Sequence, residues 1–227
     1  MRMTYTQKYV AELFGTFLLT LIIISAAGSV VGGIVAAIAL ALIVYILGPI
    51  SGGHVNPAIT LAVWGAGNRN GSRMSGRDVG GYIISQLVGA VLALLVMMYV
   101  FQFNIVAGTL FFADFSMPQV AVLVAELIGS VIFGIGVGAV VLGRIPASLS
   151  GVVIGGSLLL GGIVANLNGA LGLLNPAIAL AVQPQGVLVY MAIAIIGVSL
   201  GVQLIKFLYQ GPKGRVVEVI EVTEVLS

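Results

Sequence analysis

Two short stretches decide how this chain folds: SGGHVNPAIT at residues 51–60 and LLNPAIALAV at residues 173–182. Each contains Asn-Pro-Ala within an otherwise apolar region. Asn is a favoured helix N-cap because its side-chain oxygen accepts a backbone N–H of the first turn, and Pro suits the first helical position. The stretches therefore predict two short helices, at about 57–66 and 176–183, that begin after Asn56 and Asn175.

The composition places the chain in a membrane. Of the 227 residues, 60% are hydrophobic and 7% are charged, whereas soluble domains contain about 25% charged residues. Three ranges contain no Asp, Glu, Lys or Arg, and each is longer than the roughly 20 residues that one membrane-spanning helix needs: 13–53, 79–113 and 145–205. The sequence therefore predicts an all-α membrane protein.

Breaks at Gly, Pro and charged residues divide the apolar sequence into six long helices, at about 8–28, 34–51, 78–101, 118–143, 148–167 and 186–209. The two Asn-Pro-Ala segments are shorter. At about 1.5 Å per residue, neither can cross a hydrocarbon core of about 30 Å. Because irregular backbone cannot face lipid, we expect both to be re-entrant half-helices that are enclosed by protein or line a watery cavity.

The two halves of the chain resemble each other. VAELFGTF at residues 10–17 recurs 114 positions later as VAELIGSV, and Asn56 recurs 119 positions later as Asn175. Three spans per half is an odd number, so the second copy must be inverted relative to the first, as in other inverted-repeat membrane proteins. We predict a single channel domain at residues 1–210, with repeats at about 8–101 and 118–209, followed by a tail at 211–227.

The basic residues predict the orientation. In the predicted topology all nine fall on one face of the membrane, and an excess of Lys and Arg marks the cytoplasmic side: Arg2, Lys8, Arg69, Arg73, Arg77, Arg144, Lys206, Lys213 and Arg215. We therefore expect a multi-pass protein of the plasma membrane with both termini, including the tail, in the cytoplasm. The bases are too scattered to form a phosphate-binding stripe, so no nucleic-acid partner is expected.

The two half-helices predict a constriction near the middle of the bilayer. Each amino end carries roughly half a positive elementary charge, which repels cations. With the cap oxygens occupied, the side-chain NH₂ groups of both Asn residues are expected to donate freely into one lumen, which passes neutral molecules. The residues of this predicted constriction are Asn56, Pro57, Ala58, Asn175, Pro176 and Ala177.

These motifs identify a resemblance to a known family. AELFGTF at residues 11–17, SGGHVNPAIT, the second AEL at 125–127 and the second Asn-Pro-Ala resemble the aquaporins and aquaglyceroporins, also called major intrinsic proteins. The resemblance implies a homotetramer in which every subunit has its own pore. It also implies a passive channel for water and small neutral solutes such as glycerol-like molecules, urea or ammonia.

The outer selectivity filter departs from that family. The resemblance implies an arginine directly after the second Asn-Pro-Ala, but this chain has Ile178 there. The two other filter positions, twenty residues before Asn56 and twelve before Asn175, fall on Ala36 and Ile163. Because the loop before Asn175 is longer than usual, Gly161 or Gly162 could replace Ile163. All of these residues are small or aliphatic, so we expect a wide, apolar outer filter.

Three further polar residues have two interpretations each. Glu12 and Glu126 lie within predicted spans, where an ionisable group suggests a proton or cation path; the resemblance implies instead that each supports the neighbouring re-entrant loop. His54 is the only histidine, and it is either a structural anchor of its loop or a pH-sensitive gate. One histidine without cysteines does not make a metal site.

Other functional classes remain as alternatives. Inverted repeats and broken helices are shared with coupled secondary transporters, and a scaffold that has lost its filter would keep the architecture without conducting. Enzymatic activity is not expected, since the sequence offers no nucleophile with a base, no metal cluster and no nucleotide-binding loop. The sequence therefore predicts no cofactor.

Overall fold

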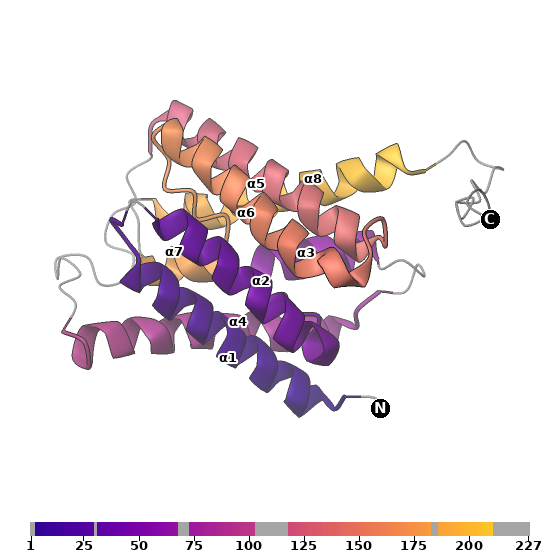
Figure 1. The fold of residues 1–227 in the computed structure, drawn as a ribbon, viewed down its shortest axis with the longest axis horizontal. Coiled ribbons are helices and arrows are strands. Elements are labelled where there is room, and N and C mark those ends of the chain that lie inside the picture. The colour runs from indigo at the N-terminus through magenta and orange to yellow at the C-terminus, as the bar shows by residue number, and fades with distance from the viewer. Residues whose placement is uncertain (1–2, 30, 68–72, 103–117, 183–185, 211–227) are drawn as a thin grey trace, which may run out of the picture.

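The computed structural model describes residues 3–29, 31–67, 73–102, 118–182 and 186–210, and all regular elements within them are helices. Six helices are long and apolar enough to cross a membrane. They are α1 (Tyr5–Ser25), α2 (Gly32–Ser51), α4 (Gly76–Tyr99), α5 (Val120–Val141), α6 (Ser150–Leu167) and α8 (Val187–Leu208), with a short 3₁₀ turn η1 (Ala147–Leu149) before α6 (Figure 1). The predicted tail at 211–227 lies outside the described residues.

The six predicted spans are confirmed, with ends that differ by up to three residues. The largest difference is in α1, which begins at Tyr5 rather than at residue 8. Thr4 caps this helix by accepting from Gln7 N, while the Gln7 side chain accepts from Thr4 N. Such a reciprocal capping box satisfies two unpaired backbone donors, so the helix starts before the apolar run does.

Two half-helices complete the bundle, α3 (Pro57–Ala66) and α7 (Pro176–Val182). They enter from opposite ends of the long helices and point towards the middle of the molecule (Figure 1). The bounds of α3 are those predicted. The described part of α7 ends at Val182, one residue before the predicted end, because residues 183–185 lie outside the described residues.

The packing follows the predicted inverted repeat. α1 packs along α4, and α5 packs along α8 in the same way, while α2 and α6 pair across the two halves. Each half-helix contacts the last long helix of the opposite half: α3 lies against α8, and α7 lies against α4. Glycine permits the closest approaches, since a Cβ at Gly89 would collide with Leu13 O and one at Gly134 would collide with Val198 O.

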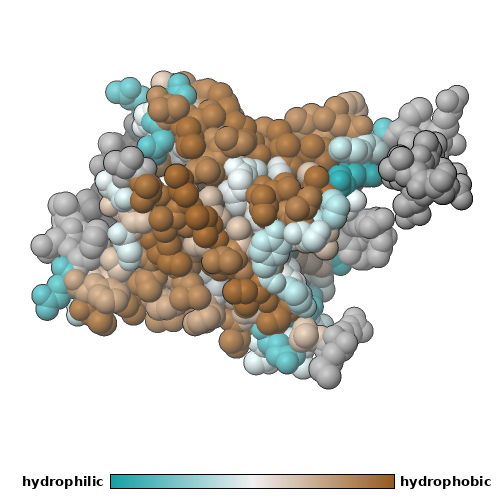
Figure 2. Space-filling model, in the orientation of Figure 1, coloured by the Kyte–Doolittle hydropathy of each residue, from teal (hydrophilic) through white to brown (hydrophobic). Residues whose placement is uncertain are grey.

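The outer surface matches a bilayer. Hydrophobic side chains cover the middle of the face shown in Figure 2, and hydrophilic ones gather towards the two ends of the long helices. The start of α1 and the end of α8 lie at the same end of the bundle (Figure 1). The five described basic residues belong to this end: Lys8 in the first turn of α1, Arg73 and Arg77 just before and at the start of α4, Arg144 after α5 and Lys206 in the last turn of α8.

Candidate functional site

The two Asn-Pro-Ala motifs cap the half-helices as their sequence predicts. Asn56 Oδ1 accepts from Ala58 N at 2.8 Å, and Asn175 Oδ1 accepts from Ala177 N at 2.9 Å. Both asparagine side chains are buried. The amino ends of α3 and α7, with their partial positive charge, are therefore fixed by local sequence.

The same asparagines also join the two halves of the chain. Asn56 Nδ2 donates to Leu174 O at 3.0 Å, and Asn175 Nδ2 donates to Val55 O at 3.0 Å. Each NH₂ group has two N–H bonds, so one is used in this reciprocal contact and one is left. The prediction that these NH₂ groups are left free to donate into the lumen needs a correction for one hydrogen of each, which satisfies a carbonyl of the opposite loop.

The residues before the two asparagines adopt an uncommon backbone conformation. Val55 has φ of 41° and Leu174 has φ of 50°, in the left-handed region that non-glycine residues rarely occupy and that costs of the order of 1–3 kcal/mol. In each case the carbonyl of the strained residue accepts from the opposite asparagine. The cross-connection and the loop conformation therefore depend on each other.

A small cavity lies where the half-helices meet. The centre of a water molecule can occupy about 10 Å³ of this cavity, so the cavity has room for roughly one water molecule. Two polar side chains line it, those of Asn56 and Asn175. The remaining lining is apolar: Leu19, Ile23, Leu40, Ile59, Phe133, Leu158, Leu173 and Ile178.

Most of this lining comes in pairs from the two repeats. Leu19 and Phe133 are each seven residues after the glutamate of an Ala-Glu-Leu motif, and Ile59 and Ile178 are each three residues after a capping asparagine. Sequence reasoning missed these apolar lining residues. The repeat offsets of 114 and 119 could have found them, since residues related by an inverted repeat face the same axis.

The filter residues predicted from the sequence separate into two groups. Ile178 is 1% exposed and lines the cavity beside the asparagines. Ala36 lies one turn before Leu40 on α2, and Leu40 lines the cavity, so Ala36 lies on the side of α2 that faces the cavity, one turn further from the centre.

The structure does not bring Ile163 to the cavity. Ile163 is 44% exposed and belongs to a stripe of exposed residues on α6, which comprises Val152, Leu160, Ile163 and Leu167. Leu158, which lines the cavity, lies about 140° around the helix from Ile163. Counting twelve residues back from Asn175 therefore leads to the exposed side of α6. Gly162, one turn after Leu158, lies closer to the cavity side, and a Cβ there would meet only Gly172 O, at 3.8 Å.

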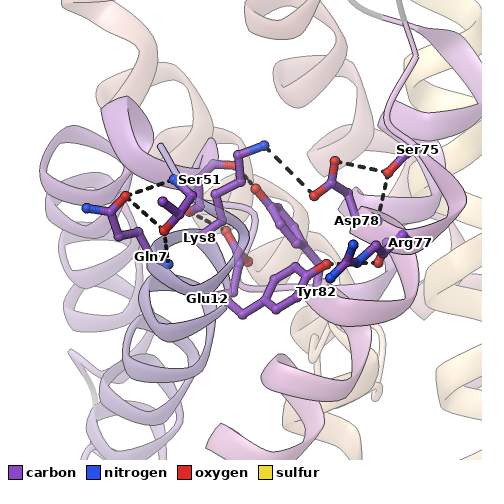
Figure 3. A network of polar contacts seen from close by, with 10 residues as sticks. Gln7, Lys8, Glu12, Ser51, Ser75, Arg77, Asp78 and Tyr82 are labelled. Atoms are coloured by element: carbon purple, nitrogen blue, oxygen red, sulfur yellow. Dashed lines mark hydrogen bonds and ion pairs between the residues drawn. The ribbon is translucent and has the colours of Figure 1, made fainter. Parts of the chain in front are cut away.

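Glu12 is the centre of the support for the first re-entrant loop. Its carboxylate accepts from His54 N at 3.0 Å, Val55 N at 2.7 Å, Ser51 Oγ at 2.6 Å and Gln86 Nε2 at 2.7 Å. Because Ser51 ends α2 and Gln86 belongs to α4, three helices meet at this carboxylate of α1. The hydroxyl of Tyr82 on α4 also donates to Ser51 O at 2.6 Å (Figure 3).

Glu126 does the same for the second loop with fewer partners. It accepts from Gly172 N at 2.8 Å and from Leu174 N at 2.9 Å. Glu12 and Glu126 both lie fully buried, and these backbone contacts match the loop-support interpretation. Each carboxylate holds the residue that precedes a capping asparagine, Val55 or Leu174.

His54 is enclosed beside the first carboxylate. Its Nδ1 lies 3.2 Å from Thr60 Oγ1 on α3, and its ring packs edge-on against the ring of Tyr82 with centroids 5.4 Å apart. These contacts tie the loop to the half-helix and agree with a structural anchor. Among the described residues, no group of three or more His, Cys, Asp or Glu side chains is placed to hold a metal ion.

The comparisons with known proteins agree with this architecture. The major intrinsic protein family matches residues 1–183. The chain is 33% identical over 214 residues to the probable aquaporin AqpM of Archaeoglobus fulgidus, covering 78% of this chain and 82% of that protein. It is 41% identical over 92 residues to the glycerol uptake facilitator protein-like 6 of Lactiplantibacillus plantarum, covering 38% of this chain and 40% of that protein.

A solved structure shows the same fold. The aquaglyceroporin from Plasmodium falciparum matches with a TM-score of 0.64 and 17% sequence identity, over 90% of this chain and 95% of that one. Six long helices and two half-helices capped by Asn-Pro-Ala, together with the family match and the relative from Archaeoglobus, lead to one conclusion: this chain belongs to the major intrinsic protein family.

Proposed function

We propose that this chain is a passive channel for water and small neutral solutes, with an outer filter that is wider and more apolar than that of a strict water channel. The observation that carries the proposal is the reciprocal pair of Asn56 and Asn175 at the small central cavity. A solute with a hydroxyl or amide oxygen accepts hydrogen bonds there from the remaining N–H of each asparagine, while the apolar lining holds its carbon atoms.

Cations are excluded at the centre. The amino ends of two half-helices meet at the cavity, and each contributes roughly half a positive charge in a place with little water. A carboxylate at the lumen would offset this charge, but both buried glutamates are occupied by loop donors. The proposed pathway therefore passes neutral molecules.

The outer filter consists of Ala36, Gly162 and Ile178. None of these side chains donates a hydrogen bond or carries a charge, so the filter does not replace the hydration shell of a strongly polar solute. It leaves room instead for the carbon skeleton of a glycerol-like molecule, and urea and ammonia are also small enough to enter. The local similarity to a glycerol uptake facilitator-like protein supports this substrate class.

The assembly and orientation belong to the same proposal. The chain forms a homotetramer in the plasma membrane with both termini in the cytoplasm, and the orientation is supported by the described basic residues at one end of the bundle through the positive-inside rule. Large apolar side chains exposed on α2 and α6 provide surface for lipid or for neighbouring subunits.

A coupled transporter is not supported. Such proteins bind their coupling ion through oxygen ligands near the midplane, whereas both oxygens of each buried carboxylate, Glu12 and Glu126, already accept hydrogen bonds from the protein. The matching family and the relative from Archaeoglobus are also a family of channels and an aquaporin rather than coupled carriers.

Stopped-flow light scattering on proteoliposomes tests the proposal. Vesicles containing the chain are exposed to gradients of sucrose for water flow, and of glycerol and urea for solute entry. Faster water flow and faster glycerol entry than in empty liposomes, without dependence on an ion gradient, are expected. Rates equal to those of empty liposomes for every solute would contradict a channel and favour a non-conducting scaffold.

A further inference from the structure

Lys206 makes a contact with the first half-helix that the channel architecture alone does not require. Its Nζ donates to Ala66 O at 2.7 Å, joining the last turn of α8 to the last turn of α3. Ala66 is buried and Lys206 is partly buried. The last four carbonyls of a helix have no partner within it, and Lys206 satisfies one of them with a charged donor.

The position of this ammonium group matters for electrostatics. α3 has 10 residues and is therefore about 15 Å long, with its positive amino end at the central cavity and its negative carboxyl end beside Lys206. Left alone, the negative end attracts cations as strongly as the positive end repels them. A lysine at the carboxyl end offsets the attraction, so both ends of α3 are net positive when Lys206 is counted with the helix.

The second half-helix has no equivalent cation in the described structure. α7 packs through Ala177 and Ala181 against Ala90, Leu94 and Met97 of α4, and the last turn of α4 contains no basic residue. The sequence has no Lys, Arg or His between Arg144 and Lys206. Within the described residues, a basic side chain thus supports the half-helix of the first repeat. The second repeat has the uncharged Ile178 directly after its Asn-Pro-Ala motif.

We propose that Lys206 is a positioning residue that acts through α3: it holds the carboxyl end of this half-helix and offsets its negative pole, so that cations are repelled in a chain whose filter carries Ile178. The inference rests on the proposed function, because it assigns a selectivity role within the same pathway. Lys206 itself touches the half-helix backbone and not the solute.

The test separates charge from attachment. Lys206→Arg keeps both the charge and the donors, Lys206→Gln keeps a donor without the charge, and Lys206→Met keeps neither. Lys8→Met is the matched control, because it removes one base from the same end of the bundle, where Lys8 lies 3.9 Å from Asp78 and not at a half-helix. Each full-length variant is reconstituted into liposomes with a trapped pH-sensitive dye.

Proton leak after an imposed pH gradient and glycerol entry are measured on the same vesicles. We expect Lys206→Gln and Lys206→Met to leak protons about fivefold faster than the unmodified chain, with glycerol entry within about twofold of it, and Lys206→Arg and Lys8→Met to behave like the unmodified chain.

Three results would overturn the inference: no increase in leak for Lys206→Gln, an equal increase for Lys206→Arg, or an equal increase for Lys8→Met. Glycerol entry decides the proposed function separately. If the unmodified chain admits neither glycerol nor water, the channel fails, whereas normal solute entry with unchanged leak removes only the role of Lys206. If Lys206→Met does not fold, the leak of Lys206→Gln decides the role of Lys206, because this variant keeps a donor to Ala66 O.

Discussion

The side-chain nitrogen of Asn175 lies 3.0 Å from the carbonyl oxygen of Val55, 120 residues earlier in the chain. The mirror contact joins Asn56 to Leu174 O at the same distance. Each asparagine thus performs two tasks with one amide, since it caps its own half-helix and satisfies a strained carbonyl of the opposite loop, and we propose that its remaining N–H serves the lumen. The constriction of this channel is therefore also the joint between its two halves.

Asn175→Asp tests this joint. A carboxylate can still cap α7, but it cannot donate to Val55 O, and the two oxygens repel each other. We expect a loss of about 1–3 kcal/mol in stability and a faster proton leak, because a negative charge replaces a donor at the amino ends of the half-helices. Thermal unfolding in detergent and dye-based leak in liposomes are the measurements. Unchanged leak in a folded variant would show that the asparagine amide does not face the lumen.

Much of this site was predictable because its causes are local. N-capping by asparagine, proline in the first turn and the length of an apolar run depend on neighbouring residues, so the half-helices and the six spans follow from sequence. The donation from Asn56 to Leu174 O could not be predicted, since it depends on how two loops 118 residues apart meet. The exposed position of Ile163 could not be predicted either, because counting along the chain does not show which face of α6 a residue lies on.

Ile178→Arg tests the apolar filter. Ile178 is buried at the cavity, so an arginine there brings a charge and several donors into the pathway and narrows it. We expect the ratio of glycerol to water permeability to fall about tenfold, because water can exchange its hydrogen bonds with a guanidinium in a narrow space more readily than a bulkier solute can. An unchanged ratio in a folded variant would argue that Ile178 does not line the conducting path. Stopped-flow swelling with both gradients supplies the ratio.

The neighbouring residues Gly162 and Ile163 provide a matched pair on α6. Gly162→Val adds volume on the cavity side, where a Cβ meets only Gly172 O at 3.8 Å, and we expect slower glycerol entry with less effect on water. Ile163→Ala removes volume from the exposed stripe and is expected to leave both rates within about twofold, since Ile163 lies about 100° around the helix from Gly162 and faces away from the cavity. The reverse pattern, with Ile163 controlling glycerol entry and Gly162 neutral, would restore the filter assignment made from sequence counting.

The two buried glutamates differ in how many donors they hold, and this difference predicts unequal losses. Glu12 accepts from Ser51, His54, Val55 and Gln86, whereas Glu126 accepts from two backbone N–H groups of its loop. A glutamine has one acceptor oxygen and one NH₂ group, so Glu12→Gln brings a donor against other donors at a buried site. We expect Glu12→Gln to cost about 3 kcal/mol of stability and Glu126→Gln about half of that, as measured by thermal or denaturant unfolding in detergent.

The proton leak of the folded variants distinguishes loop support from a proton relay. If the carboxylates only hold the loops, the leak per folded channel does not decrease in either variant. If protons pass through the carboxylates, the substitutions interrupt the relay and the leak falls. Equal destabilisation by the two substitutions would mean that the extra partners of Glu12, those from α2 and α4, contribute little to holding the first loop in place.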